Sequence, residues 1–387
     1  MKVLYDHQIF EMQRFGGISR YFCELFNGLE KNNEIEVDLS VTYATNEYLK
    51  GTRFSHRPKA DPGSYEAFMG GREFRGKWNL YTIRNRFLKP LNAKDANRLA
   101  SIEALKRQDF DVFHPTYYDD YFLPYIGKKK FVLTVYDMIH ELYPEYFNLA
   151  ELTADRKRRL AEKAHKIIAI SECTKRDLID FYGIDAAKIE VVYLANSLNT
   201  QTVSLPASLK LPVRYVLFVG ARAGYKNFYF FVHAMRGLLA RDPTLHIVCT
   251  GAEFTKNERA FLKIHRLSER VGHRAVSDTA LENLYAHALV FVFPSLYEGF
   301  GLPILEAFSS HCPVVLGRAG SLPEIGGDGA LYFEPKDAKS LQEVMADALY
   351  NPARRAELVE RGNARLSLYS WGRTCKETGA LYCQLLA

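Results

Sequence analysis

Hydrophobic residues make up 48% of the 387-residue chain and charged residues 25%, and the formal net charge is +6. This composition is typical of a globular protein and excludes a largely disordered one, and so modest a charge gives no argument for nucleic acid as a partner. The chain is longer than a single hydrophobic core usually supports, so two domains are expected.

The sequence gives no sign of secretion or of a membrane span. The first residues lack a signal-peptide pattern, and apolar runs such as 289–294 fall far short of the roughly 20 residues that cross a bilayer. Six cysteines are scattered without the spacing of a zinc site, so reduced thiols are expected. We therefore expect a cytoplasmic protein.

Short apolar, β-branched runs alternate with amphipathic segments along the first half of the chain. This is the pattern of βα units around a parallel sheet. Strands are predicted at 2–5, 37–41, 112–114, 131–136, 167–170 and 190–193. Helices are predicted at 18–29, 96–106, 152–164 and 173–182, with Ser171 as the N-cap of the last.

A polar segment at 198–212 that ends in Leu-Pro is predicted to link two domains. Strands resume at 215–220, 245–249, 289–293, 314–316 and 330–333, again separated by helical segments. The sequence therefore predicts an α/β protein of two doubly wound domains, at 1–197 and 213–369. The last segment, 370–387, is predicted to be a helix that packs back across the cleft.

The strongest motif is VFVFPSLYEGFGLPILEA at 290–307. A buried strand ends at Pro294, a turn with two glycines follows, and Pro303 is expected at the first position of a new helix. The N–H groups of 299–301 would then lie at a helix N-terminus, where a diphosphate can bind. Glycine on both sides of Phe300 allows a ligand to approach the main chain.

Two glutamates of this motif are spaced to hold both ends of a nucleotide sugar. Glu306 lies one helical turn in, within reach of a ribose diol, and Glu298 precedes the turn, where the sugar would lie. The segment resembles the E-x7-E signature of glycosyltransferase family 4, retaining enzymes of the GT-B fold. An ordinary strand, turn and helix with two exposed carboxylates is the alternative interpretation.

The resemblance implies two facing Rossmann-like domains, with the acceptor on the N-terminal side and the donor in the C-terminal domain. In this family an arginine and a lysine neutralise the donor diphosphate, and Arg222 and Lys226 occupy the matching places. A glycine loop closes over the phosphate from the other domain. Two surface cations and a tight turn are the alternatives. The implied donor-binding residues are Gly16, Gly17, Arg222, Lys226, Glu298, Gly299, Phe300, Gly301, Leu302 and Glu306.

Catalytic residues are expected at 134–141, where a buried strand delivers Asp137 and His140 to its carboxyl end. Many family members carry a histidine directly before this aspartate, whereas this chain has Tyr136. Which of Asp137 and His140 contacts the donor sugar and the acceptor hydroxyl therefore stays open, with a structural role as the alternative for each. Together with Glu298 they form the predicted catalytic set.

No metal and no cofactor are expected, because fixed cations can stabilise a departing nucleoside diphosphate. The sequence has no D-x-D flanked by apolar residues. Asp119 and Asp120 lie among aromatic residues and are expected to line the acceptor groove or to form a turn.

The stretch 50–107 is basic and aromatic, with 14 Lys and Arg against 5 Asp and Glu. Such a stretch would attract an anionic lipid surface on the inner face of the cytoplasmic membrane, or a phosphate-bearing acceptor. A solvated surface insertion is the alternative interpretation.

The resemblance implies transfer of a hexose from a nucleoside diphosphate sugar to a saccharide or lipid-linked saccharide. By analogy, a mannosyltransferase of surface polysaccharide biosynthesis (O-antigen, lipopolysaccharide or capsule) is favoured, with a GDP-linked mannose or deoxyhexose preferred to a UDP-linked donor. The acceptor oxygen would attack the face that the leaving group vacates, with the β-phosphate taking the proton. A covalent intermediate on Asp137 is the rival route. A sugar-nucleotide epimerase of the same fold and a non-catalytic nucleotide-binding protein remain the alternatives.

Overall fold

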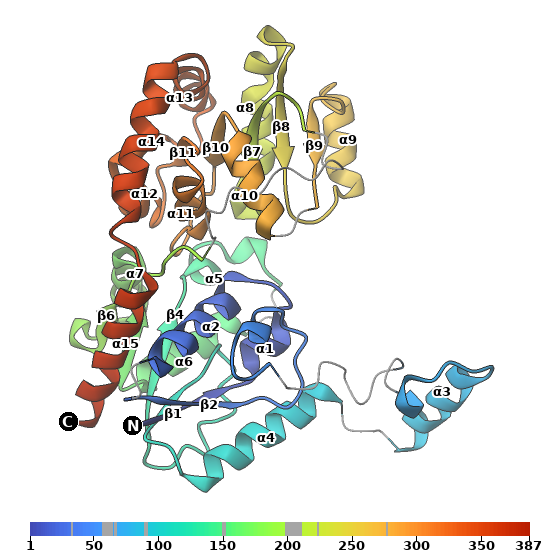
Figure 1. Cartoon of the computed structure of the whole chain (residues 1–387), viewed down its shortest axis with the longest axis vertical. Helices are drawn as coiled ribbons and strands as arrows, with labels where there is room; N and C mark the ends of the chain where they lie inside the picture. The colour runs from blue at the N-terminus through green and yellow to red at the C-terminus, as the bar shows by residue number, and fades with distance from the viewer. Residues whose placement is uncertain are drawn as a thin grey trace.

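The computed structural model of the protein describes residues 1–31, 34–55, 65, 68–88, 92–148, 152–197, 211–222, 224–275 and 278–387. Two six-stranded parallel sheets, each with its own helices, occupy separate halves of the molecule (Figure 1). The predicted pair of doubly wound α/β domains is therefore confirmed. Most of the predicted linker, 198–210, lies outside the described residues, so the predicted domain boundaries stay a prediction.

The N-terminal sheet has the strand order β2-β1-β3-β4-β5-β6. The chain winds outward in both directions from β1 and β3, so the switch point, where parallel sheets bind ligands, lies between these two strands. The strands are β1 (Lys2–Asp6), β2 (Glu36–Ser40), β3 (Val112–His114), β4 (Lys130–Val135), β5 (Lys166–Ala169) and β6 (Ile189–Val191).

The four helices predicted in this half are present as α2, α4, α6 and α7, with α4 starting three residues earlier than expected, whereas α1, α3 and α5 were not predicted. Ser171 is confirmed as the N-cap of α7, since its side chain accepts from the N–H of Thr174. The helices, including short 3₁₀ turns (η), are α1 (Gln8–Met12), α2 (Gly17–Glu30), η1 (Tyr48–Gly51), η2 (Phe68–Gly71), α3 (Lys77–Leu88), α4 (Ala93–Arg107), α5 (Ile139–Leu142), η3 (Pro144–Tyr146), α6 (Thr153–Lys163), α7 (Glu172–Tyr182) and η4 (Ala186–Lys188).

The C-terminal sheet repeats this plan with the strand order β12-β11-β10-β7-β8-β9 and its switch point between β7 and β10. One strand, β9, was not predicted, because three residues that include a glycine give no apolar run. The strands are β7 (Arg214–Phe218), β8 (Leu245–Cys249), β9 (Val271–His273), β10 (Val290–Phe293), β11 (Val314–Gly317) and β12 (Ala330–Phe333).

Helices cover both faces of the C-terminal sheet, and its central strands are fully buried, as expected for a parallel sheet. The helices of the second half of the chain are η5 (Gly224–Lys226), α8 (Phe228–Arg241), α9 (Lys256–Ile264), α10 (Asp278–His287), α11 (Leu302–Ser309), α12 (Leu322–Gly326), η6 (Gly327–Gly329), α13 (Ala338–Tyr350), α14 (Pro352–Leu366) and α15 (Trp371–Leu386), of which α15 leaves this domain.

The last helix, α15, returns to the N-terminal half and packs against α2 and β5 (Figure 1). Tyr382 carries the deepest contact, with its hydroxyl 2.8 Å from that of Tyr5 and 2.6 Å from His114 Nδ1. Gly28 of α2 permits the close approach of the two helices, because a Cβ there would lie 2.2 Å from Cys375 Sγ. Residues 371–386 are therefore part of the N-terminal core.

Candidate active site

The turn after β10 has the conformation that its glycines suggest. Gly301 has a φ of 101°, a left-handed conformation that favours glycine, and α11 begins at the next residue. Pro303 is the second residue of that helix rather than the first, and a missing N–H is tolerated there as well. Ser321 Oγ lies 2.9 Å from the carbonyl oxygens of both Glu298 and Phe300. The serine therefore fixes the turn from the side of α12.

Lys226 and Glu298 meet at the carboxyl ends of β7 and β10, beside the switch point. Lys226 Nζ lies 2.6 Å from Glu298 Oε1, and the two side chains are 16% and 13% exposed. Burial, the largest single influence, lowers the pKa of Lys226, but the charge and hydrogen bond of Glu298 together with Tyr225 and Asp137 outweigh it, and the pKa is raised. The structure thus brings a permanent cation and the first glutamate of the motif together.

Arg222 does not join this pair, because its guanidinium is buried inside the C-terminal domain. Its Nε donates to Glu258 Oε1 at 2.8 Å, and its terminal nitrogens donate to the carbonyls of Thr250 and Ala252 at 2.9 and 2.5 Å. The guanidinium also lies 4.8 Å from the centre of the Phe254 ring. In this arrangement its hydrogen bonds are made within the protein, so the predicted contact with a diphosphate stays a prediction.

Glu306 lies in α11 and contacts both domains. Its Oε2 accepts a hydrogen bond from the Tyr285 hydroxyl at 3.1 Å, and its Oε1 lies 3.7 Å from Arg20 Nη1 of α2. The side chains of Arg20 and Glu306 are each only 12% exposed. Arg20 is held in turn by Tyr48, to which it donates at 2.8 Å and on whose ring it stacks. The second glutamate of the motif is therefore bridged to the N-terminal domain.

The glycine loop lies beside the amino end of α11. Gly16 is the N-cap of α2 and Gly17 is its first residue. A Cβ on Gly17 would lie 3.3 Å from Leu302 Cδ1, and Leu302 is the first residue of α11. Two helix N-termini from different domains thus come close together. Each carries partial positive charge, and the first N–H groups of a helix have no partner within the helix, so the pair suits an anion.

Asp137 lies directly against the turn of the other domain. A Cβ on Gly299 would lie 1.8 Å from the Tyr136 carbonyl oxygen and 2.9 Å from Asp137 Cβ, so only glycine fits. Asp137 Oδ1 accepts from the N–H of Ile139 at 3.1 Å, and the side chain remains 33% exposed. The structure therefore brings the predicted aspartate and the predicted donor turn into contact.

The side chains of Tyr136 and His140, which lie before and after Asp137 in the sequence, contact other groups. Tyr136 is buried, and its hydroxyl donates to the carbonyl of Thr116 at 3.2 Å. His140, on α5, stacks on Phe147 with their ring centres 4.0 Å apart. Asp137 lies against the donor turn whereas His140 lies against an aromatic ring, but which of the two is essential stays a prediction.

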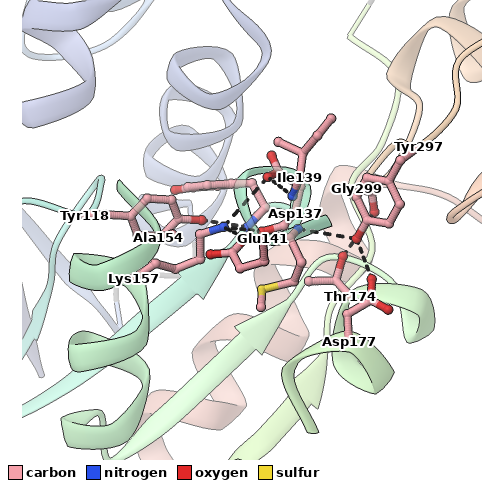
Figure 2. Close-up of polar contacts among 12 residues, drawn as sticks. Tyr118, Asp137, Ile139, Glu141, Ala154, Lys157, Thr174, Asp177, Tyr297 and Gly299 are labelled. Carbon is pink, nitrogen blue, oxygen red and sulfur yellow. Dashed lines mark hydrogen bonds and ion pairs between the residues drawn. The ribbon is translucent and has the colours of Figure 1, made fainter. Parts of the chain in front are cut away.

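Further bonds join the two domains around this point (Figure 2). The Tyr297 hydroxyl accepts from the N–H of Met138 at 3.3 Å and donates to Asp177 Oδ2 at 2.5 Å. The Glu324 carboxylate of α12 accepts the first two N–H groups of α7, at 2.8 and 3.0 Å. A carboxylate at a helix N-terminus stabilises that helix, so here one domain caps a helix of the other.

A cavity of about 250 Å³ opens at the carboxyl ends of β1 and β3, at the switch point of the N-terminal sheet. Its polar and aromatic lining includes Glu11, Lys94, Arg98, Tyr117 and Asp119. Tyr117 stacks on Tyr136, the residue before Asp137, with their ring centres 6.5 Å apart. Asp119 therefore lines a cavity near the domain boundary, whereas Asp120 pairs with Arg159 at 2.6 Å.

Sequence reasoning missed several residues of this site, namely Arg20, Lys157, Tyr285, Tyr297 and Glu324. Arg20 follows the glycine pair by three residues, and Tyr297 directly precedes Glu298 in the motif, so each had a signal nearby. The other three lie in ordinary helical or loop sequence, and only their distant partners indicate a role.

Within the described ranges, no helix is long and apolar enough to cross a membrane, and no cluster of three or more His, Cys, Asp or Glu side chains is placed to hold a metal ion.

Two facing parallel α/β domains, with a glycine turn and two glutamates at their boundary, define the class of the GT-B glycosyltransferases. Family models agree over most of the chain. The model described as Glycosyltransferase Family 4 matches residues 15–195, and the model described as Glycosyl transferases group 1 matches residues 206–365. The chain belongs to this group 1/family 4 of glycosyltransferases and is a glycosyltransferase enzyme.

Several curated proteins of similar sequence are mannosyltransferases. The O-antigen chain mannosyltransferase B of Escherichia coli is 28% identical over 67% of this chain and 71% of its own length. The O-antigen chain mannosyltransferase RfbU of Salmonella typhimurium is 28% identical, over 62% of this chain and 65% of its own length, slightly less than two thirds. The MMP alpha-(1->4)-mannosyltransferase of Mycolicibacterium hassiacum is 27% identical, over 75% of this chain and 74% of its own length.

Solved structures share the fold over nearly the whole chain. Anabaena HepE in complex with UDP and glucose matches with a TM-score of 0.73 at 16% identity, covering 99% of this chain and 100% of that one. A sucrose-phosphate synthase from Thermosynechococcus elongatus matches with a TM-score of 0.71 at 19% identity, covering 99% and 98%. At this level of identity the likeness establishes the GT-B fold alone.

Proposed function

We propose that the protein is a retaining, metal-independent transferase that moves a hexose from a nucleoside diphosphate sugar to a saccharide hydroxyl, in the synthesis of a surface polysaccharide such as an O-antigen or capsule. Mannose or a deoxyhexose on GDP is the favoured donor. The observation that carries the proposal is the contact between Asp137 and the Gly299 turn, beside the Lys226–Glu298 pair. The three mannosyltransferases named above support the choice of sugar.

The donor is proposed to bind with its diphosphate between the amino ends of α2 and α11, where main-chain N–H groups and Lys226 would meet it. Fixed donors and cations of this kind stabilise the charge that develops on a leaving diphosphate, and they need no reorganisation during the reaction. Glu306 would accept the ribose hydroxyls, which requires Arg20 to move away from its Oε1. Glu298 would hold the sugar.

The acceptor is proposed to enter from the cavity at the carboxyl ends of β1 and β3. Tyrosine rings beside charged side chains suit a saccharide, because its C–H face packs on aromatics and its hydroxyls bond to polar groups. From this side the hydroxyl would reach the donor carbon next to Asp137. It attacks the face that the leaving group vacates, and the β-phosphate takes its proton.

The segment around α3 is proposed to hold the enzyme at an anionic membrane surface, where a lipid-linked acceptor would lie. This helix stands apart from the rest of the N-terminal half (Figure 1). Residues 68–88 carry five Lys or Arg against one Glu, and Trp78 and Ile83 are 61% and 53% exposed. Basic charge together with exposed aromatic and aliphatic side chains is what such a surface attracts.

The donor site is tested with a thermal-shift screen of the protein against UDP, GDP, ADP and their sugars, followed by transfer assays with the best donor. Glu306→Ala removes the proposed ribose acceptor, so the donor KM should rise about 10- to 100-fold, the cost of losing hydrogen bonds to a charged group. Glu343→Ala, an exposed glutamate on α13 of the same domain, is the matched control.

Two results would contradict the proposal. One is a Glu306→Ala enzyme whose donor KM equals that of the wild type. The other is donor conversion without acceptor to an epimeric nucleotide sugar, which would make the protein an epimerase.

A further inference from the structure

Lys157 of α6 is a fully buried lysine beside the proposed reaction centre. Its side chain has no exposure to solvent, and its ammonium lies under the segment that carries Asp137 (Figure 2). Moving a charge out of water costs several kcal/mol unless partners compensate for it, so such a residue requires an explanation.

The partners of Lys157 are all on or next to the segment 137–141. Its Nζ donates to the Asp137 carbonyl oxygen at 2.8 Å and to Glu141 Oε2 at 2.9 Å, and it lies 3.9 Å from Asp137 Oδ1. The ring of Tyr118 covers it, with the ring centre 5.4 Å away. The same lysine therefore holds the main chain of Asp137 and faces its carboxylate.

Glu141 provides the compensating charge and is itself anchored. Its side chain is only 7% exposed, and its second oxygen accepts a hydrogen bond from the hydroxyl of Tyr182 on α7. This network connects the segment 137–141 to α6 and α7 through charged groups. An apolar pair of similar volume would stabilise the fold as well or better, since buried ion pairs rarely add net stability. Stability alone thus does not account for the lysine.

The peptide on the other side of the Asp137 Cα, whose carbonyl belongs to Tyr136, faces the donor turn. A Cβ on Gly299 would lie 1.8 Å from the Tyr136 carbonyl oxygen and 2.9 Å from Asp137 Cβ, so the turn touches the main chain that Lys157 supports. Asp137 therefore lies between the buried ammonium of Lys157 in its own domain and the donor turn of the other domain. A shift of about 1 Å at such a position can cost about 100-fold in rate.

We infer that Lys157 is a positioning residue for sugar transfer, which holds Asp137 against the donor turn through its carbonyl and its carboxylate. The inference rests on the proposed function and concerns the transfer step rather than donor binding. The Tyr136 side chain does not share this role, because its hydroxyl is bonded to the Thr116 carbonyl.

The test compares Lys157→Met in the wild-type and Asp137→Asn backgrounds. In the wild-type background kcat should fall about 100-fold, while nucleoside diphosphate affinity, measured by calorimetry, stays within about threefold. In the Asp137→Asn background the same change should cost less than about threefold, because a residue that acts through Asp137 has nothing left to position. Lys175→Met is the control: this half-buried lysine of α7 also donates to a carbonyl, that of Ile189 on β6.

Folding is controlled by a second variant, Lys157→Met with Glu141→Gln, which removes both buried charges. It should melt near the wild-type temperature and still lose the same fraction of kcat. Equal losses of kcat for Lys157→Met in both backgrounds, or wild-type kcat in the folded double variant, would overturn the inference and leave the transferase intact. A wild-type protein that binds a nucleoside diphosphate but transfers no sugar to any acceptor would overturn the proposed function as well.

Discussion

Two cations follow β7, and the structure puts them in different environments. Lys226 is paired with Glu298 at the domain boundary, whereas Arg222 is paired with Glu258 inside the C-terminal domain. The sequence alone does not distinguish Arg222 from Lys226, because both lie in the loop after the same strand. Their hydrogen bonds separate them, because the guanidinium of Arg222 also holds the carbonyls of Thr250 and Ala252.

The two residues should therefore respond differently to loss of charge. Lys226→Met should lower kcat/KM about 100-fold with the fold retained, since it removes a fixed cation at the leaving group. Arg222→Met should lower the free energy of unfolding by about 3–5 kcal/mol, because it leaves the Glu258 carboxylate buried and unpaired. Urea unfolding and donor kinetics of both variants check this, with Arg318→Met, an exposed cation after β11, as control.

One outcome would support the diphosphate contact that the family resemblance implies for Arg222. If Arg222→Met unfolds at the wild-type urea concentration and yet binds the nucleotide far more weakly, its guanidinium contacts the diphosphate when the donor is bound.

At the scale of elements, the sequence predicted well what depends on neighbouring residues. The buried strands, the glycine turn at 299–301 and the cap of α7 each have a signal within a few positions of the chain. Contacts between distant elements had none: Arg20 meets Glu306 and Glu324 caps α7 from another domain. Such pairs depend on how two domains approach each other, which neither periodicity nor spacing encodes.

The attachment of α15 to the N-terminal sheet depends on a buried histidine. His114 has no exposure, and its two ring nitrogens lie 2.6 Å from the Tyr382 hydroxyl and 2.8 Å from Thr134 Oγ1. Burial lowers the pKa of His114 to about 3. The folded state therefore requires the neutral ring, while the unfolded chain takes up a proton near pH 6.5.

Acid should consequently destabilise the protein through this one group. The contribution of neutral His114 is fully present above pH 6.5 and is lost as the pH falls from 6.5 toward 3, by about 1.4 kcal/mol per pH unit. Urea unfolding at pH 7, 6 and 5 measures it. His114→Gln, which has no titratable ring, should lower the free energy of unfolding at pH 7. The change of this free energy with pH should be smaller by the amount that one titrating group contributes. An unchanged slope would contradict the assignment.

Among the described residues, the segment around α3 projects from the N-terminal half (Figure 1). Residues 68–88 carry a net charge of +4, from five Lys or Arg and one Glu. The chain has two tryptophans, and Trp78 of α3 is 61% exposed whereas Trp371 is half-buried. Fluorescence therefore reports mainly on this segment when it meets a surface.

Vesicles that contain anionic lipid should bind the protein and shift the tryptophan emission to shorter wavelength, whereas neutral vesicles should not. Arg72→Glu with Arg75→Glu should weaken binding by at least about 10-fold, since each basic residue near such a surface contributes about 1 kcal/mol. The control reverses two exposed lysines of the C-terminal half, Lys336→Glu with Lys339→Glu. Equal binding of both double variants would contradict a membrane contact through α3.

Gly299 has a mechanical consequence for the two halves. Real Cβ atoms essentially never come within 3.0 Å of another heavy atom, yet one placed here would lie 1.8 Å from the opposing carbonyl oxygen. A single methyl group at this position would thus force the two halves apart where Gly299 meets Tyr136 and Asp137. If the two halves tilted about this contact, the gap between them would be larger at points farther from it. The packing of the two halves seen here therefore requires that residue 299 has no side chain.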